Sequence, residues 1–370
     1  MTTVTETQGP TVGSGTAAPH ERFFSAGAAQ VLDDHDRALW AALQQATAHG
    51  KRFRPALLTG VHAALGGEDH ARAERVGDAV ELLHTAFVIH DDVIDGDQVR
   101  RGRPNVSGTF AARAVADGAD PARAGRYGEA AGILAGDLAL AGAVREIATC
   151  GARPDVTVAL LDLLEEVLHR SAAGELADVR LSLTGAAPMA EVLDVAEWKT
   201  AAYSFELPLR AGALLAGASD STVATLGAVG RCMGVGFQLQ DDLDGVFAPS
   251  ARTGKDPLGD LREGKCTALV AVARTTAWWP ELSRYVGDPH LTPEGAARAR
   301  EILLACGALH VVSDLVRDLR EAALAGVADL PAPVQDFLRP MVTLLLRPEE
   351  DRWTAAESLG RPVTGVQGAA

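Results

Sequence analysis

The chain has 370 residues, of which 47% are hydrophobic and only 5% aromatic, so a large core built from aliphatic side chains is expected. That composition favours helices over strands. The formal net charge of -15 disfavours a nucleic-acid-binding role, because a phosphate backbone requires a basic face.

Residues 1–22 are rich in Thr, Gly and Pro and predict a disordered N-terminal tail. They contain no basic region followed by an apolar stretch, so no secretory signal is expected, and no uncharged apolar run is long enough for a transmembrane helix. The four cysteines form no CxxC pair, which indicates a reducing compartment without a zinc site. These features together predict a cytoplasmic protein.

Helical patterns dominate the rest of the chain up to a second tail at 351–370. Clear cases are residues 71–95, 156–179 and 297–326, in which apolar residues recur at spacings of three and four. Loop-like breaks are expected near 101–108, 116–126, 184–189, 248–264 and 287–293. The prediction is therefore a single large all-α bundle over residues 23–350, with antiparallel neighbours joined by short loops.

The first basic motif is GKRFRP, residues 50–55, which places Lys51 and Arg54 at the start of an apolar segment. Anions bind favourably near a helix N-terminus, so this motif is a candidate anion site. Taken alone, it also fits an ordinary solvated turn.

An acidic cluster ends the pattern of residues 71–95. Asp91 and Asp95 are four residues apart and share a helix face, Asp92 lies at its edge, and His84 lies two turns earlier. Like charges at the negative end of a helix require a compensating cation, and carboxylates of this spacing suit a Mg²⁺ ion that also bridges substrate phosphates. A solvated helix end with a charged loop is the alternative.

Arginines follow the acidic cluster directly, with Arg100 and Arg101 foremost. Arginine suits bidentate phosphate recognition. A second apolar helix ends in GFQLQDDLD, residues 236–244, where Asp241 and Asp242 follow Gln238. If the two acidic ends face each other, they could hold several Mg²⁺ ions and a diphosphate between them.

Two weaker basic motifs complete the set. EWKTAAYSFELP contains Lys199 and Thr200, and GKDPLGDLREGK contains Lys255 and Lys265. Surface lysines are the ordinary reading of either motif by itself.

The order and content of these motifs resemble the trans-isoprenyl diphosphate synthases over roughly residues 23–350. The resemblance implies an all-α isoprenoid synthase fold around a central cavity, and a homodimer. It also implies head-to-tail condensation of isopentenyl diphosphate with an allylic diphosphate, using three Mg²⁺ ions per active site.

The resemblance assigns roles residue by residue. It implies a metal-binding set of Asp91, Asp92, Asp95, Asp241 and Asp242. It implies an allylic diphosphate site formed by Arg100, Lys199, Thr200, Gln238 and Lys255. It implies an isopentenyl diphosphate site formed by Lys51, Arg54, His84 and Arg101. The residues expected to matter most for catalysis are Asp91, Asp95, Lys199, Asp241 and Lys255.

Three positions depart from the family pattern. Gly245 takes the last place of the second acidic motif, with Asp244 one residue early. Residues 105–110 lack the histidine that is usual soon after the arginines, and Glu175 replaces a usual glutamine.

Product length is expected to depend on the residues one turn before Asp91. Bulky Phe87 could form a partial floor, while small Ala86 leaves room beside it, and this combination points to C20 geranylgeranyl diphosphate. Farnesyl or longer polyprenyl products are alternatives, as is ordinary core packing for Phe87.

Two other functions remain open. A class I terpene cyclase also ionises an allylic diphosphate, but it needs no second diphosphate pocket. A non-catalytic subunit of a heteromeric synthase would carry eroded acidic motifs, and the altered second motif keeps that possibility open.

Overall fold

The computed structural model describes residues 20–48, 52–247 and 259–347, and these residues are almost entirely helical, which confirms the all-α prediction. The helices are α1 (Glu21–Ala28), α2 (Asp34–Thr47), α3 (Phe53–Ala64), α4 (His70–Ile94), α5 (Val106–Ala116), α6 (Pro121–Ala148), α7 (Pro154–Thr184), α8 (Met189–Val195), the π-helix η1 (Ala196–Glu206), α9 (Leu207–Leu215), α10 (Asp220–Phe247), α12 (Gly259–Glu263), α13 (Ala268–Arg274), α14 (Trp279–Leu282), α15 (Pro293–Ala305), α16 (Ala308–Ala328) and α17 (Ala332–Leu345). A two-residue hairpin, β1 (Val99–Arg100) and β2 (Arg103–Pro104), follows α4.

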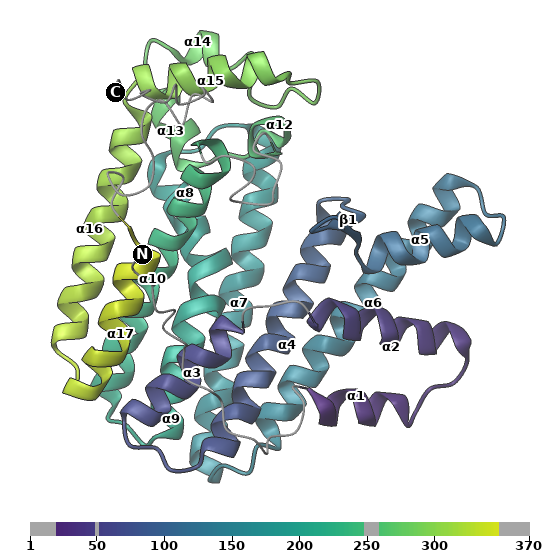
Figure 1. Ribbon diagram of the computed structural model, residues 1–370, viewed down its shortest axis with the longest axis vertical. Coiled ribbons are helices and arrows are strands. Elements are labelled where there is room, and N and C mark those ends of the chain that lie inside the picture. Colours follow the sequence, from purple (N-terminus) through teal and green to yellow (C-terminus); the bar gives the residue numbers. More distant parts are fainter. Residues whose placement is uncertain (1–19, 49–51, 248–258, 348–370) are drawn as a thin grey trace, which may run out of the picture.

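The long helices run along the long axis of the molecule (Figure 1). In this view α16 and α17 cover one side next to α10, while α1, α2 and α5 lie on the other side next to α4 and α6. The short helices α12 to α15 lie across the upper end. The carboxyl ends of α4 and α10 also point toward the upper end, so the two acidic motifs lie at the same end of the bundle.

Three clusters of buried aliphatic side chains fill the bundle. The largest joins α10 and η1 to α13, α15, α16 and α17, the second lies among α4, α7 and α9, and the third joins α2, α4, α5 and α6. Glycines allow α6 to approach the last turns of α4, because a Cβ atom on Gly132 would overlap Val93 and one on Gly136 would overlap His90. This close packing fixes the position of the acidic end of α4.

The sequence boundaries agree with the structure in part. The patterns at 71–95 and 156–179 correspond to α4 and α7, but the prediction of a continuous helix over 297–326 is wrong. The chain breaks at Gly307, whose φ of 81° is left-handed and interrupts the helix between α15 and α16.

Helix α1 begins at Glu21, two residues inside the expected tail, and the rest of that tail and the expected tail 351–370 lie outside the described residues. Among the described helices, none combines the length and the apolar character needed to cross a membrane.

Candidate active site

The acidic end of α4 carries three carboxylates with different surroundings. Asp91 contacts Arg100 at 3.2 Å and Lys199 at 3.1 Å. Asp92 is only 3% exposed and accepts a 2.6 Å hydrogen bond from Nε of Arg100. Burial raises the pKa of Asp92 to about 6, although Arg100 opposes the rise. Asp95 caps the helix as an exposed residue, yet desolvation of its carboxyl and the charge of Asp91 raise its pKa.

Lys199 of η1 forms ion pairs that link η1 and α7 to this acidic end. Its ammonium lies 2.7 Å from Asp178 and 3.1 Å from Glu175, both on α7, in addition to its contact with Asp91 on α4. Burial opposes the charged form, but the three carboxylates together raise the pKa of Lys199 above its ordinary value. One protonated lysine is therefore shared by three carboxylates, and it offsets their charge only in part.

The second acidic motif is connected to the same segment through hydrogen bonds. The Thr200 hydroxyl donates to Oε1 of Gln238 at 2.8 Å, and Nε2 of Gln238 donates to Asp242 at 2.8 Å. Asp242 is 9% exposed, whereas Asp241 is half-buried on α10. Because Lys199 and Thr200 are adjacent, η1 contacts the first motif through one residue and the second motif through the next.

A separate basic group lies next to the middle of α4. The Arg54 guanidinium lies 5.2 Å from the Tyr203 ring centroid, and that ring stacks on His84 at 5.8 Å between centroids. Burial lowers the pKa of His84 well below its ordinary value, and the charges of Arg54, Arg100 and Arg101 lower it further. His84 is therefore surrounded by arginines, and the group forms a candidate anion site that is distinct from the acidic end.

Glu81 is a buried carboxylate beside this basic group that the sequence interpretation did not include. It is 6% exposed, and its Oε2 has no hydrogen-bond partner. Burial raises its pKa, while Arg54, Arg52 and Arg101 oppose the rise. The adjacent pair of Arg52 and Asp78 is joined by an ion pair.

The two residues expected to control product length point into different environments. Phe87 is half-buried and packs edge-on against Tyr203, with ring centroids 5.0 Å apart. Ala86 is fully buried in the cluster that α4 forms with α2, α5 and α6. Of the two, Phe87 lies on the face of α4 that also bears Asp91.

The carboxylates suit a divalent ion whose coordination is completed by water and substrate phosphates. Among the described residues, no three His, Cys, Asp or Glu side chains form a metal-binding group by themselves. Mg²⁺ is usually held by one or two carboxylates together with water and substrate phosphates, so a complete protein cage is not needed. The ammonium of Lys199 already contacts Asp91, which shows that this carboxylate can face a cation.

The structure thus brings together most of the residues singled out from the sequence. Lys51 and Lys255 lie outside the described residues. The sequence interpretation did not assign roles to Glu175 and Asp178 as partners of Lys199, or to Tyr203 beside His84. A usable signal was the acidic pair Glu175 and Asp178, since residues three apart lie on one face of a helix such as α7.

Comparisons with known proteins agree on one family. A sequence profile described as polyprenyl synthetase matches residues 36–280. The geranylfarnesyl diphosphate synthase of Aeropyrum pernix is 32% identical over 315 residues, covering 84% of this chain and 93% of the relative. The geranylgeranyl diphosphate synthase of Mycobacterium tuberculosis is 33% identical over 283 residues, covering 76% and 75%.

A solved structure has the same overall arrangement. The geranylgeranyl pyrophosphate synthase of Corynebacterium glutamicum, complexed with isoprenyl diphosphate and magnesium, superimposes with a TM-score of 0.81 at 29% identity. The match covers 88% of this chain and 95% of that one.

Proposed function

The chain belongs to the polyprenyl synthetase family of prenyltransferases, and we propose that it condenses isopentenyl diphosphate with an allylic diphosphate to form C20 geranylgeranyl diphosphate. The observation that carries the two-substrate proposal is the presence of basic residues from other elements at two levels beside one helix, α4. Lys199 and Arg100 contact the acidic end of α4, while Arg54 and Arg101 surround His84 two turns earlier. A terpene cyclase, which binds one diphosphate, has no use for the second group.

We assign the allylic diphosphate to the acidic end and isopentenyl diphosphate to the group around His84. Asp91, Asp95 and Asp241 would hold Mg²⁺, with three ions per site, and Asp242 would support them. The metal supplies charge neutralisation that makes the allylic diphosphate a better leaving group. The Corynebacterium glutamicum enzyme, complexed with isoprenyl diphosphate and magnesium, supports the use of magnesium together with an isoprenyl diphosphate.

The protein's own part in the reaction is to position two anions and to protect a cation. Arg100 and Lys199, together with Lys255, hold the allylic diphosphate, and release of that diphosphate leaves an allylic carbocation. Thr200 and Gln238 flank the reacting carbons, and the double bond of isopentenyl diphosphate attacks the cation. The released diphosphate then takes the proton, so no protein base is required.

The other diphosphate is held by the group around His84. Arg54, His84 and Arg101 bind isopentenyl diphosphate there, together with Lys51. A neutral imidazole among arginines can gain a proton when this anion arrives, because the anion offsets the charges that lower the pKa of His84.

We place the growing chain along the face of α4 that bears Phe87. The ring of Phe87 packs against Tyr203 and would meet the end of a C20 chain. The relatives support a product in this range, because their names include geranylgeranyl and geranylfarnesyl diphosphate synthases.

The test is elongation by the purified chain. The protein is incubated with Mg²⁺, labelled isopentenyl diphosphate and each of the C5, C10 and C15 allylic primers, and the dephosphorylated products are sized by chromatography. A C20 alcohol as the main product is expected, and Asp91→Asn, folded by circular dichroism, should lose most of its activity. Failure to elongate any primer would overturn the proposal, a cyclic hydrocarbon would indicate a cyclase, and activity only after addition of a second protein would indicate a subunit.

We also propose that the enzyme is a homodimer that uses the outer face of α6. Tyr127, Ile133, Leu134 and Val144 are between 37% and 55% exposed on this helix. Such an apolar surface is expected to be covered. Light scattering after size-exclusion chromatography should give twice the chain mass, and replacing Leu134 with Glu should give a monomer. A monomeric wild-type chain would contradict the dimer without affecting the assigned reaction.

A further inference from the structure

The segment that carries Lys199 and Thr200 has an unusual backbone. η1 is a π-helix of 11 residues, whereas π-helical turns generally occur singly inside α-helices, often at functional sites. Glycines on both neighbouring helices accommodate it. A Cβ atom on Gly174 of α7 would lie 2.5 Å from the backbone nitrogen of Lys199, and one on Gly234 of α10 would lie 2.4 Å from the Cα atom of Ala201.

One arginine of α7 contacts both ends of this π-helix. The Arg170 guanidinium donates to both carboxylate oxygens of Glu206, at 2.9 and 3.1 Å, and to Glu197 at 2.8 Å. Glu197 and Glu206 are the second and last residues of η1, and Glu206 is only 1% exposed. A buried carboxylate of this kind depends strongly on its partners, because removal of Arg170 would leave Glu206 with only a longer ion pair, to Arg231 at 3.6 Å.

This double contact is possible only in the wider winding. In an α-helix, nine residues make about two and a half turns, so residues 197 and 206 would point to opposite sides. In a π-helix, whose hydrogen bonds join residues five apart, nine residues make about two turns and both glutamates face the same side. If η1 returned to α-helical winding around a fixed Glu206, Lys199 would rotate by about a third of a turn.

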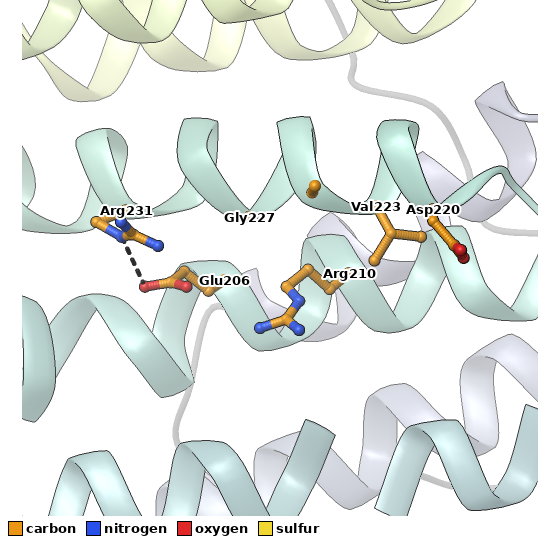
Figure 2. Close-up of a pocket in the computed structure, with 7 residues that line it drawn as sticks. Glu206, Arg210, Asp220, Val223, Gly227 and Arg231 are labelled. Atoms are coloured by element: carbon orange, nitrogen blue, oxygen red, sulfur yellow. Dashed lines mark ion pairs between the residues drawn. The ribbon is translucent and has the colours of Figure 1, made fainter. Parts of the chain in front are cut away.

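A second arginine approaches the same two carboxylates from α10. Nε of Arg231 lies 3.6 Å from Glu206 and 3.5 Å from Glu197. Figure 2 shows Arg231 directed at Glu206 along one wall of a cavity of about 330 Å³, with Arg210 further along the same groove. The two ends of η1 are therefore held between an arginine of α7 and an arginine of α10.

We propose that Arg170, by binding Glu197 and Glu206 together, acts as a positioning clamp that holds η1 in its π-helical winding and thereby directs Lys199 toward Asp91. Arg170 does not touch substrate in this scheme and acts through Lys199. The inference rests on the proposed function, because its consequence is measured as affinity for an allylic diphosphate.

The test compares binding of farnesyl diphosphate by calorimetry, with Mg²⁺ present and isopentenyl diphosphate omitted so that no condensation occurs. Arg170→Met should weaken binding about tenfold or more, because Lys199 no longer points to the diphosphate. In the Lys199→Ala background the same substitution should have little further effect, since a residue that acts through Lys199 cannot act in its absence. Additive losses in this double-mutant cycle would overturn the clamp.

The matched control is Arg210→Met. Arg210 makes two 3.0 Å hydrogen bonds to Glu166 and joins α9 to α7. Glu166 also lies 3.5 Å from Arg170, so Arg210→Met removes a neighbour of Arg170 and leaves the contacts of Arg170 with Glu197 and Glu206 in place. Loss of Arg210 should change farnesyl diphosphate affinity by less than about twofold. An equal effect of Arg210→Met and Arg170→Met would show a general loss of packing and contradict the clamp.

A folding failure of Arg170→Met does not end the test. Glu197→Gln removes one end of the double contact at a partly exposed residue, and it should weaken binding in the wild-type background but not in the Lys199→Ala background. Wild-type protein that elongates primers while the clamp variants bind normally would overturn the clamp alone. Wild-type protein that neither binds nor elongates an allylic diphosphate would overturn the proposed function and the clamp with it.

Discussion

The Lys199 ammonium lies 3.1 Å from a carboxylate oxygen of Asp91, so a lysine of η1 forms an ion pair with the acidic end of α4. Glu175 and Asp178 share the same ammonium. A metal ion or a diphosphate that binds at Asp91 would therefore interact with this whole ion-pair cluster. The charge balance at this point is the basis of the first prediction.

Replacing Lys199 with Met should leave three carboxylates without their shared cation. We expect the variant to melt several degrees below the wild type in the presence of a chelator, because uncompensated partly buried charges are costly. Added Mg²⁺ should raise its melting temperature more than that of the wild type, since the ion can take the vacated position. Arg153→Met, which removes an exposed ion pair with Asp155, is the control and should respond to Mg²⁺ as the wild type does. Equal Mg²⁺ shifts in all three proteins would contradict the prediction.

Asp91 and Asp92 should differ in function although they are adjacent. Asp92 is buried against Arg100, so Asp92→Asn should weaken the hold on Arg100 and raise the KM for the allylic diphosphate about tenfold, with Mg²⁺ half-saturation changed less than about twofold. Asp91→Asn should instead reduce kcat by about 100-fold or more and increase the Mg²⁺ requirement. Steady-state kinetics at graded Mg²⁺ concentrations distinguish the two, and identical profiles for both variants would refute the division of roles.

Product length should respond to Phe87 and not to Ala86. Phe87→Ala removes the ring beside Tyr203 and should shift products beyond C20. Ala86→Leu adds volume in the fully buried cluster with α2, α5 and α6, so it should lower stability by about 1–3 kcal/mol without shortening the product. Chromatography of the products and denaturant melts measure both effects. An unchanged product distribution in Phe87→Ala would show that Phe87 does not limit the length of the product chain.

Glu81 should make stability depend on pH. Burial raises its pKa in the folded protein, so between the ordinary glutamate pKa and this raised value the folded state binds more protons than the unfolded chain. The free energy of unfolding therefore falls as the pH rises through that range, and the full penalty remains above it. Glu81→Gln should raise the melting temperature at about pH 8, with a smaller gain at about pH 5.

The control for Glu81 is another buried glutamate that has a partner. Glu146 is 9% exposed and accepts a 2.6 Å hydrogen bond from Arg75. Glu146→Gln should therefore lower stability at both pH values, because it weakens a paired group. A Glu81→Gln variant that is destabilised at pH 8 as Glu146→Gln is would show that the carboxylate is a net stabilising partner of the nearby arginines.

Local pattern was sufficient for some of the helices that carry the site, but not for η1. Periodic apolar residues located α4 and α7, and the spacing of Asp91 and Asp95 placed both on one face. Periodicity failed at Gly307, where a single left-handed residue divides a pattern that is continuous in sequence. It also gave no indication of η1, a π-helix that packs against α7 and α10.

The sequence by itself determined the helical class, the acidic and basic residues available for chemistry, and the family resemblance, since these follow from composition and short-range spacing. Tertiary structure alone decided which charges meet. Asp178 pairs with Lys199, Arg170 binds both ends of η1, and Ala86 packs with α2, α5 and α6 while Phe87 packs against Tyr203. Residues such as Arg170 and Glu206 are 36 positions apart, and only the packing of α7 against η1 brings their side chains together.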